Sequence, residues 1–330
     1  MSALMPQKTL RIRSLKHLGW SLETSPEALE MLVEKASRYY RSFERDVKGK
    51  RRILVESTGP LKRVQRRILD RVLMRLAPFP ASFGSVKGKT IKDNAEVHLT
   101  SRFVAKLDIR SFYPSIHSAR VYKFFMSQEC SPDVSRVLTA LTTKDYALPL
   151  GTSSSPALAD QIVRPIDLRI YGMAAKAGLK YTRYVDDITL SGPFSLERFS
   201  KTVVKVLRQT GFQVKKSKLV FYQPSERTNE RVITGVAIRG GRLTAPFDYL
   251  KSLEEELREA VRQSRRQHVD GDFSPREHYR GKIAYIAWLD PGRGARLLRL
   301  YRRVKWTHLE WAMRQQAGAS GVQRTRLLEL

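Results

Sequence analysis

The stretch RYVDDITL at residues 183–190 places two adjacent acids between two short apolar runs. This pattern predicts a β-hairpin whose tip carries Asp186 and Asp187. Adjacent carboxylates at such a tip can hold divalent metal ions, because hard cations such as Mg²⁺ prefer oxygen ligands. A solvated hairpin tip is the simpler interpretation of the pair taken alone. Residues elsewhere in the chain favour the metal site.

A third carboxylate stands at the end of an earlier apolar run. In VAKLDI, residues 104–109, Asp108 follows alternating apolar positions typical of a strand. Three carboxylates at strand ends suit a site with two Mg²⁺ ions about 4 Å apart, where Mn²⁺ can substitute. Such ions activate an attacking hydroxyl and stabilise a leaving pyrophosphate. Asp108, Asp186 and Asp187 are therefore the predicted catalytic ligands, and the carbonyl of Ile109 is a candidate fourth.

The charge of the chain favours a polyanionic partner. Its 330 residues carry 61 Lys and Arg against 32 Asp and Glu, a net charge of +29, and 42% are hydrophobic, enough for a core and more than one subdomain. Nucleic acid is the leading partner, because basic side chains gain free energy by releasing its counterions. An anionic membrane surface is the competing partner. The basic residues are spread along the chain, which indicates a folded, positively lined cleft.

The sequence contains no long apolar span, and residues 1–20 lack the apolar core of a signal peptide. These features predict a soluble, cytoplasmic protein with no membrane partner. Cys130 is the single cysteine, which excludes an internal disulfide and a thiolate metal cage. The six histidines are scattered without ligand spacing, so a structural role is the simpler interpretation of His98.

The apolar spacing predicts an α+β protein. Strands are expected at 103–109 and 182–190, and a further hairpin over 231–244 turns at Gly240–Gly241. Helices are predicted at 25–45, 61–76, 118–129, 156–176, 195–210 and from 246 onward, with Ser25 and Ser274 as caps and a break at 290–292. Strands and helices alternate through the middle of the chain, which fits a ferredoxin-like split β-α-β arrangement.

Two features near the acids suit nucleotide binding. Tyr113 follows Asp108 by five residues, and an aromatic ring there can stack under a sugar and exclude a 2′-hydroxyl; the alternative is a core position, which we prefer for Phe112. In the turn of residues 148–158, Gly151 permits close approach of a substrate, and Ser155 suits phosphate or template contacts. Ordinary capping by Ser155 is the alternative, and both can hold.

Basic residues are candidates for phosphate contacts. Arg52, at the end of the basic turn 50–52, suits the triphosphate because guanidinium binds phosphate bidentately; a solvated turn is the alternative. Lys215, Lys216 and Lys218 are candidates for neutralising the leaving group. Lys215 is selected, and the sequence does not distinguish it from Lys216.

In order and spacing these elements resemble a reverse transcriptase over residues 50–245. The resemblance rests on Asp108 with Tyr113, the turn at 151–156, YVDD at 184–187, Gly211 with its lysines, and the hairpin at 232–238. Within that family the chain resembles bacterial retron reverse transcriptases, through LKRVQ at 61–65, NAEVH at 94–98 and ITG at 233–235. It departs from their pattern at Ser57, Leu150 and Val185, where proline, glutamine and alanine are usual.

The resemblance implies a right-hand polymerase fold. Fingers would occupy residues 1–100, the palm 101–245, a helical thumb 246–315 and a tail 316–330. Some elements of the fingers would be interleaved with the palm. Residues expected to contact nucleic acid are Asn94, His98, Ser155, Tyr184, Thr234, Gly235, Arg262, Arg265, Arg266, Arg296, Arg299 and Arg303.

The resemblance also implies an activity. A retron enzyme binds its own structured noncoding RNA and uses dNTPs to copy part of it into DNA. Synthesis starts from the 2′-hydroxyl of a guanosine, and the product is branched multicopy single-stranded DNA. Such systems usually act in anti-phage defence with an accessory effector protein, and host RNase H would remove the template. The alternatives are a group II intron, diversity-generating or abortive-infection reverse transcriptase, and a catalytically silent RNA-binding scaffold.

Overall fold

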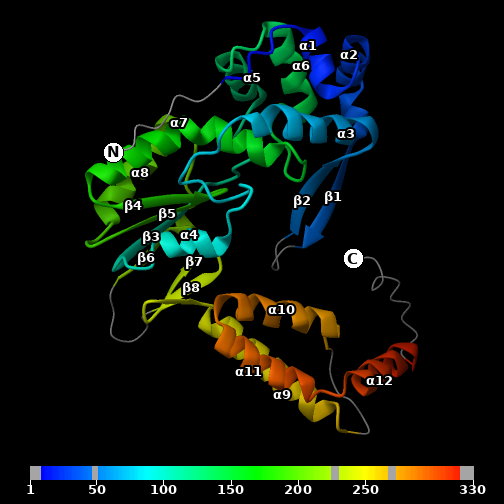
Figure 1. The fold of residues 1–330 in the computed structure, drawn as a ribbon, viewed down its shortest axis with the longest axis vertical. Coiled ribbons are helices and arrows are strands. Elements are labelled where there is room, and N and C mark those ends of the chain that lie inside the picture. The colour runs from blue at the N-terminus through cyan, green and yellow to red at the C-terminus, as the bar shows by residue number, and fades with distance from the viewer. Residues whose placement is uncertain (1–8, 47–50, 224–229, 267–272, 320–330) are drawn as a thin grey trace. The chain divides into compact units, whose positions relative to one another are not determined.

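The computed structural model describes residues 9–46, 51–223, 230–266 and 273–319. The chain divides into two compact units, Met1–Pro224 and Ser225–Leu330 (Figure 1). The first unit contains the acid pair of the hairpin and the strand that ends at Asp108. The boundaries of fingers, palm and thumb remain predictions.

The first unit begins with helices and a hairpin. α1 (Leu15–Leu22) and α2 (Pro26–Glu34) are followed by β1 (Tyr40–Asp46) and β2 (Arg51–Ser57). Ser25 caps α2 as expected, because its hydroxyl accepts from the amide of Ala28.

The helix predicted over 25–45 is wrong in its second half. α2 ends at Glu34, a 3₁₀ turn spans Ala36–Tyr39, and β1 pairs antiparallel with β2 from Tyr40 opposite Ser57 to Asp46 opposite Arg51. The physical reason is a tertiary contact: β2 supplies hydrogen-bond partners to residues 40–46, and the local sequence pattern of these residues does not predict that pairing.

The helix predicted at 61–76 is present but irregular. α3 (Gly59–Arg67) continues as a π-helical turn (Ile68–Val72) and a 3₁₀ turn (Leu73–Arg75). The next helix, α4 (Ile91–Val97), begins with a capping box in which Thr90 and Asp93 satisfy each other's backbone amides.

A four-stranded antiparallel sheet forms the centre of the first unit. Its strands are β3 (Phe103–Asp108), β4 (Lys180–Tyr184), β5 (Asp187–Gly192) and β6 (Val220–Tyr222), in the order β4-β5-β3-β6. Three helices connect β3 to β4, and one connects β5 to β6. This order and connectivity are those of the ferredoxin-like arrangement expected from the sequence.

Those helices are α5 (Ser118–Ser127), α6 (Pro132–Thr142), α7 (Ser155–Lys176) and α8 (Glu197–Gln209). Figure 1 shows α7 and α8 on one side of the sheet. The sheet and these helices share one apolar core, whose members include Leu107, Leu138, Ile170, Ile188, Leu190 and Leu207. The sequence pattern did not lead us to predict α6. The cap position of α7 is occupied by Ser154 rather than by Ser155.

The second unit joins a small sheet to helices. β7 (Arg231–Ile233), β8 (Val236–Arg239) and β9 (Arg242–Thr244) form an antiparallel meander. A two-residue turn at Thr234–Gly235 joins β7 to β8. The turn that joins β8 to β9 is at Gly240–Gly241, as predicted. Two-residue turns of this kind fix strand register tightly.

The helices of this unit are α9 (Phe247–Gln263), α10 (Arg276–Leu289), α11 (Pro291–Arg302) and α12 (Trp306–Ala319). The capping box expected at Ser274 is wrong: Pro275 occupies the cap position without a side-chain hydrogen bond. The break at 290–292 is confirmed, since Asp290 caps α11 by accepting from Arg293. Residues 316–319, expected in the tail, belong to α12.

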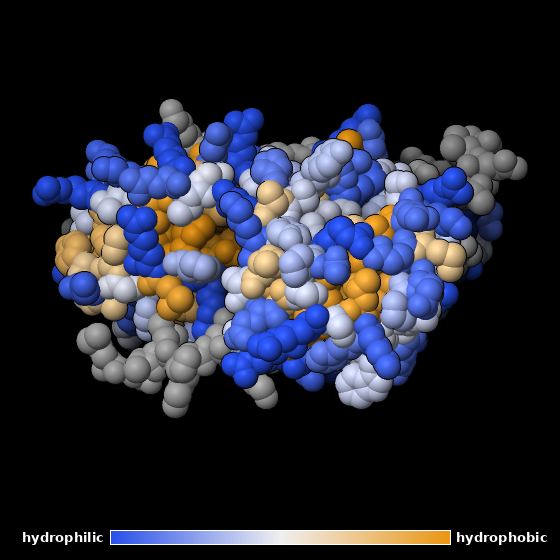
Figure 2. Space-filling model, turned by 90° about the horizontal axis from the view of Figure 1, so that it is seen from above, coloured by the Kyte–Doolittle hydropathy of each residue, from blue (hydrophilic) through white to orange (hydrophobic). Residues whose placement is uncertain are grey.

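The surface fits the composition of the chain. Hydrophilic residues cover most of the face in Figure 2, and apolar residues appear in patches between them. Among the described residues, no helix is long and apolar enough to cross a membrane.

Gly151 stands where β2 meets the turn before α7. Its φ is +123°, and a Cβ there would lie 2.8 Å from the carbonyl oxygen of Val55. The amide of Val55 donates to the carbonyl of Leu150 at 2.8 Å. The close approach expected at Gly151 is therefore made to β2 in this structure.

Replacing Gly151 by alanine should loosen β2 from this turn. We expect Gly151→Ala to lower the free energy of unfolding by about 1–3 kcal/mol, because the residue would be strained and would collide with Val55. Urea denaturation measures the change. Gly172→Ala is the matched control: Gly172 lies in α7 with nothing within 4 Å of its Cβ position, so this change should stabilise. Equal stability of the two variants would contradict the docking of β2.

Candidate active site

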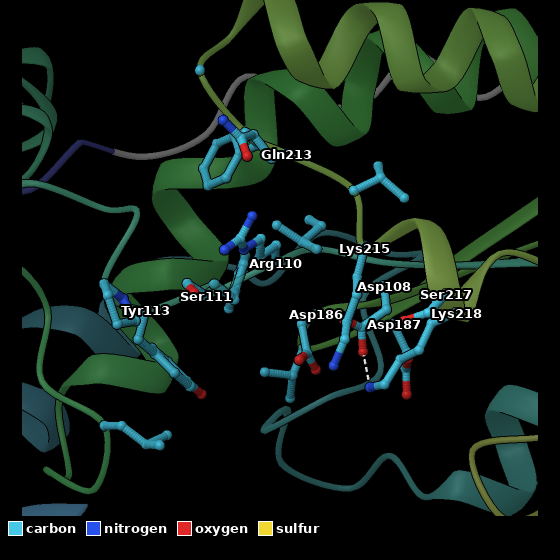
Figure 3. A pocket seen from close by; sticks show the side chains of 18 of the residues that line it. Asp108, Arg110, Ser111, Tyr113, Asp186, Asp187, Gln213, Lys215, Ser217 and Lys218 are labelled. Atoms are coloured by element: carbon cyan, nitrogen blue, oxygen red, sulfur yellow. Dashed lines mark hydrogen bonds and ion pairs between the residues drawn. The ribbon is translucent and has the colours of Figure 1, made fainter. Parts of the chain in front are cut away.

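The predicted acids border one cavity of about 1520 Å³ in the first unit. Figure 3 shows Asp108, Asp186 and Asp187 grouped beside Lys215 and Lys218, with Tyr113 across from them. Of the residues predicted from the sequence, the structure places these around the cavity: Asp108, Ile109, Tyr113, Tyr184, Asp186, Asp187 and Lys215.

The register of the sheet brings the acids together. Asp108 ends β3 and lies opposite Asp187, the first residue of β5. Asp186 lies in the two-residue turn between β4 and β5, and its carbonyl accepts from the amide of Ile109 at 2.9 Å. Backbone hydrogen bonds therefore fix the end of β3 against the hairpin tip.

Asp186 lies in an environment that disfavours its ionised form. Burial raises the pKa of Asp186, and the charges of Asp187 and Asp108 raise it further. Lys218 supplies an opposite charge, because its ammonium contacts the carboxylate of Asp108. That hydrogen bond raises the pKa of Lys218. Lys106 is a second cation whose charge interacts with Asp187 and Asp108.

Of the three candidate lysines, Lys218 makes a side-chain contact with Asp108, and Lys215 borders the same cavity. Lys215 is bound through its backbone, whose amide donates to the carbonyl of Asp108 at 2.8 Å, while its side chain borders the cavity. Lys218 makes the side-chain contact with Asp108. The side chain of Lys216 lies outside the described part of the structure.

The donor set suits a hard cation, but its side chains do not converge on one point. Within the described ranges, no group of three or more His, Cys, Asp or Glu side chains is arranged to hold a metal ion. The ammonium of Lys218 supplies a positive charge at Asp108 in this structure. Three carboxylates at one end of the sheet nevertheless supply the oxygen donors that Mg²⁺ requires.

Tyr113 forms part of the opposite wall. Burial and the nearby charge of Asp186 raise its pKa to about 12, so the phenol is protonated at neutral pH. Its ring meets that of Phe112 edge-on at 5.4 Å between centroids. Phe112 is buried in the core, which confirms the interpretation preferred for it.

Two other predicted nucleotide contacts lie differently. Ser155 is 1% exposed, and its hydroxyl is 2.7 Å from that of Thr152, so direct contact of this side chain with nucleic acid does not fit the structure. Leu150, beside Gly151, borders the cavity. The side chain of Arg52 lies outside the described residues, although its neighbour Ile53 in β2 borders the cavity.

Asn94 and His98 are wholly buried. The Nδ1 of His98 lies 2.7 Å from the hydroxyl of Ser191 in β5, and its Nε2 lies 2.8 Å from that of Thr182 in β4. Direct contact of either side chain with RNA, as the resemblance implied, does not fit these positions. The structural role that the sequence alone favoured for His98 is confirmed.

The remaining nucleic-acid candidates belong to the second unit. Thr234 and Gly235 form the β7–β8 turn, whose Gly235 carbonyl accepts from the hydroxyl of Tyr285 at 2.7 Å. Six arginines of α9, α11 and their ends are exposed: Arg262, Arg265, Arg266, Arg296, Arg299 and Arg303.

Three of these arginines border a cavity of about 520 Å³ between α9 and α11, together with Arg258. Arg258 and Arg296 both contact Glu254, at 2.7 and 3.1 Å. Arg299 and Arg303 border the same cavity, so it carries more positive than negative charge. This groove suits phosphate groups.

One buried cluster of charged side chains was not predicted from the sequence. Arg183, directly before the YVDD stretch, is enclosed by Asp160 and Asp167 of α7. A signal was present in the sequence: two acids seven residues apart share one face of a helix, and Arg183 stands inside the strand that leads to YVDD. Their partnership required the fold.

Residues 35–250 match a family model described as "Reverse transcriptase (RNA-dependent DNA polymerase)". Among curated proteins, the "Retron Ec86 reverse transcriptase" of Escherichia coli is 28% identical over 294 residues, covering 87% of this chain and 88% of the relative. The "Retron Mx65 reverse transcriptase" of Myxococcus xanthus is 29% identical over 269 residues, covering 75% and 60%.

The "Retron Se72 reverse transcriptase" of Salmonella heidelberg is 29% identical over 238 residues, covering 70% of this chain and 63% of the relative. The chain therefore spans less than two thirds of the length of the Mx65 and Se72 proteins. A solved telomerase from Candida albicans, in complex with a TWJ fragment of telomeric RNA, aligns with a TM-score of 0.45 and 11% identity over 83% of this chain and 59% of that one. That similarity is too low to support a conclusion.

The burial of His98 predicts a loss of stability on its removal. His98→Ala should lower the free energy of unfolding by about 1–3 kcal/mol, since it leaves the hydroxyls of Thr182 and Ser191 without this partner. Urea denaturation provides the measurement, and His17→Ala, at an exposed position, should change stability by less than about 0.5 kcal/mol. Unchanged stability combined with weaker RNA binding would show that His98 contacts RNA instead.

Proposed function

This chain belongs to the reverse transcriptase family, and from that premise we propose that it copies part of a cognate structured noncoding RNA into branched multicopy single-stranded DNA. The observation that carries the proposal is the grouping of Asp108, Asp186 and Asp187 around one cavity at the end of β3. The similarity to several retron reverse transcriptases supports the retron type of RNA-directed DNA polymerase.

The finer features of the reaction follow from the retron resemblance. We propose that synthesis starts from the 2′-hydroxyl of a guanosine in that RNA. We further propose that host RNase H removes the template, and that an accessory effector couples the product to anti-phage defence. Their support is the match of LKRVQ at 61–65, NAEVH at 94–98 and ITG at 233–235 to the elements usual in this lineage.

Reverse transcriptases generally use divalent metal ions, and we propose two Mg²⁺ here, with Mn²⁺ as a substitute. Asp108, Asp186, Asp187 and the carbonyl of Ile109 would hold them. The raised pKa of Asp186, caused by burial and its acidic neighbours, supports this assignment, because a bound cation would relieve that repulsion. When bound, the ions would supply activation of the attacking hydroxyl and stabilisation of the leaving pyrophosphate.

The chain's own residues would orient the nucleotide in this cavity. We assign Tyr113 to the sugar, because its ring lies across the cavity from the acids. Lys215 and Lys218 lie beside the acids, where an ammonium would neutralise charge on the leaving group. Arg52 is proposed to contact the triphosphate on the basis of its place in β2, next to Ile53.

The nucleic acid itself would be held mainly through phosphates. The arginines bordering the groove between α9 and α11 are the proposed contacts in the second unit, together with Arg262, Arg265 and Arg266. Contacts of this kind position a duplex without reading its sequence. Tyr184, which borders the cavity beside the acids, is the proposed contact in the first unit.

A catalytically silent RNA-binding scaffold is the second candidate function. The net charge of +29 alone would suit it. The acid cluster argues against it, because three neighbouring carboxylates repel one another and gain nothing from partial burial without a cation.

Asp186→Asn should abolish polymerisation. We expect Mg²⁺-dependent dNTP incorporation on a primed RNA to fall at least about 100-fold, because one ligand of the proposed metal site loses its charge. Asp145→Asn is the matched control, since the Asp145 side chain is 82% exposed and lies outside the cavity. Near-normal incorporation by Asp186→Asn would refute the proposed metal site.

The retron assignment has a test of its own in cells. When the gene is expressed with its native neighbouring DNA, RNase-treated nucleic acid should contain a discrete small single-stranded DNA that Asp186→Asn does not produce. Its absence, combined with extension of primed RNA in vitro, would keep the polymerase and favour another bacterial reverse transcriptase. The absence of a DNA product in both assays would favour the catalytically silent RNA-binding scaffold.

Tyr113→Ala should weaken discrimination against ribonucleotides. We expect incorporation of rNTP relative to dNTP to rise by about 10-fold or more, because the smaller side chain leaves room for a 2′-hydroxyl. Competition assays with matched rNTP and dNTP measure the ratio. Tyr113→Phe keeps the ring and should keep the selectivity; an unchanged ratio for Tyr113→Ala would refute the assignment.

A further inference from the structure

Arg183 is a fully buried arginine directly ahead of the YVDD stretch, with 1% of its side chain exposed. Its guanidinium forms a planar fork on two carboxylates: Nε and Nη2 donate to Asp167 at 2.7–3.0 Å, and Nη2 donates to Asp160 at 2.8 Å. The remaining nitrogen, Nη1, donates to the backbone carbonyl of Val185 at 2.9 Å. The fork therefore connects helix α7 to the tip of the hairpin.

The two carboxylates are themselves fixed. Asp160 and Asp167 are seven residues apart and so share one face of α7, where both are buried. Asp167 also accepts from the hydroxyl of Tyr181 at 2.6 Å, and Asp160 accepts from the hydroxyl of Ser82. Replacing a buried ion cluster by apolar side chains of similar size is often neutral or stabilising, so the directional bonds are the distinctive contribution of this cluster.

Those bonds end on a strained residue. Val185 has a φ of +58°, and it is β-branched, which makes this conformation unusual. It is the first residue of the two-residue turn between Tyr184 and Asp187, a position that glycine generally occupies when φ is positive. Such strain costs about 1–3 kcal/mol and persists only where the surroundings impose it.

The surroundings of the turn do impose it. The amide of Arg183 donates to the carbonyl of Ala81 at 2.9 Å, and the amide of Phe83 donates to the carbonyl of Arg183 at 2.8 Å. Gly84 lies against the turn so closely that a Cβ there would be 2.3 Å from the amide nitrogen of Val185. The guanidinium of Arg183 donates to the carbonyl of Val185, at the opposite end of that residue from its amide.

We infer that Arg183 is a positioning residue for the polymerase reaction: its guanidinium, held by Asp160 and Asp167, fixes the peptide after Val185 and thereby orients the carboxylates of Asp186 and Asp187. This inference rests on the proposed function, in which those two acids are catalytic. Lysine cannot replace arginine here, because an ammonium lacks the planar fork that engages two carboxylates and a carbonyl together. A misplacement of about 1 Å at a catalytic group can cost 100-fold in rate.

An ordinary buried ion pair is the competing explanation, and the two differ in how they depend on Val185. If Arg183 holds a strained turn, a glycine at position 185 relieves the strain and makes the arginine less necessary. If Arg183 only stabilises the core, the residue at 185 does not matter to its effect. A double-mutant cycle over Arg183→Lys and Val185→Gly separates the two.

The cycle is measured as kcat and the KM for dNTP on a primed RNA with saturating Mg²⁺. We expect Arg183→Lys to lower kcat by about 10–100-fold and to change KM by less than about 3-fold, since the acids rather than the nucleotide pocket are displaced. In the Val185→Gly background the same change should lower kcat by a factor at least about 3-fold smaller. Equal losses in both backgrounds, or no loss in either, would overturn the inference.

Tyr181→Phe separates positioning from stability. It removes one hydrogen bond to Asp167 but leaves the contact between Arg183 and Val185, so stability should fall while kcat stays within about 2-fold. If Tyr181→Phe lowers kcat as much as Arg183→Lys does, the cluster acts only through stability and the inference fails.

Should Arg183→Lys not fold, Asp160→Asn provides the second test. It keeps the Asp167 fork but removes one charge that holds the guanidinium, and its loss of kcat should likewise be smaller with Val185→Gly. Asp186→Asn, assayed in parallel, distinguishes the two levels of failure. An active Asp186→Asn refutes the proposed function, whereas an inactive Asp186→Asn with equal losses in both Val185 backgrounds refutes only the role of Arg183.

Discussion

The antiparallel register between β3 and β5 is the constraint on which the rest of the first unit depends. It sets Asp108 opposite Asp187 and allows the amide of Ile109 to bind the carbonyl of Asp186. A slip of one residue would turn Asp108 to the other face of the sheet and separate the acids. Because the apolar residues of both strands are buried, the core itself enforces the register that groups the carboxylates.

Three acids at one end of the sheet concentrate negative charge, and the fold places cations near them. Lys218 contacts Asp108 inside the cavity, and Arg183 holds the hairpin from behind with two carboxylates of its own. The two cations differ in exposure: 46% of the Lys218 side chain is accessible, against 1% for Arg183. An exposed lysine can move away when a metal ion or substrate enters, whereas a buried arginine fork provides a fixed support.

Much of the fold was predictable because its signals are local. Apolar alternation predicted β3 and the β4–β5 hairpin, and helical spacing predicted the span of α7 to within one residue. Features that depend on distant partners were not predictable in this way. Residues 40–46 form a strand because β2 lies beside them, and His98 is buried because Thr182 and Ser191 meet its two nitrogens.

The residue order of the chain by itself indicated the family, predicted the ferredoxin-like order of strands and selected three acids as metal ligands, because motif spacing and hydrophobic period are properties of the sequence. Three-dimensional packing selected Lys218 as the lysine at Asp108, enclosed Arg183 between Asp160 and Asp167, and left Val185 strained at the hairpin tip. The contacts of Lys218 and Arg183 join residues that are far apart in the chain, and such contacts also impose the strain at Val185. Only the closing of the core brings them within hydrogen-bonding distance.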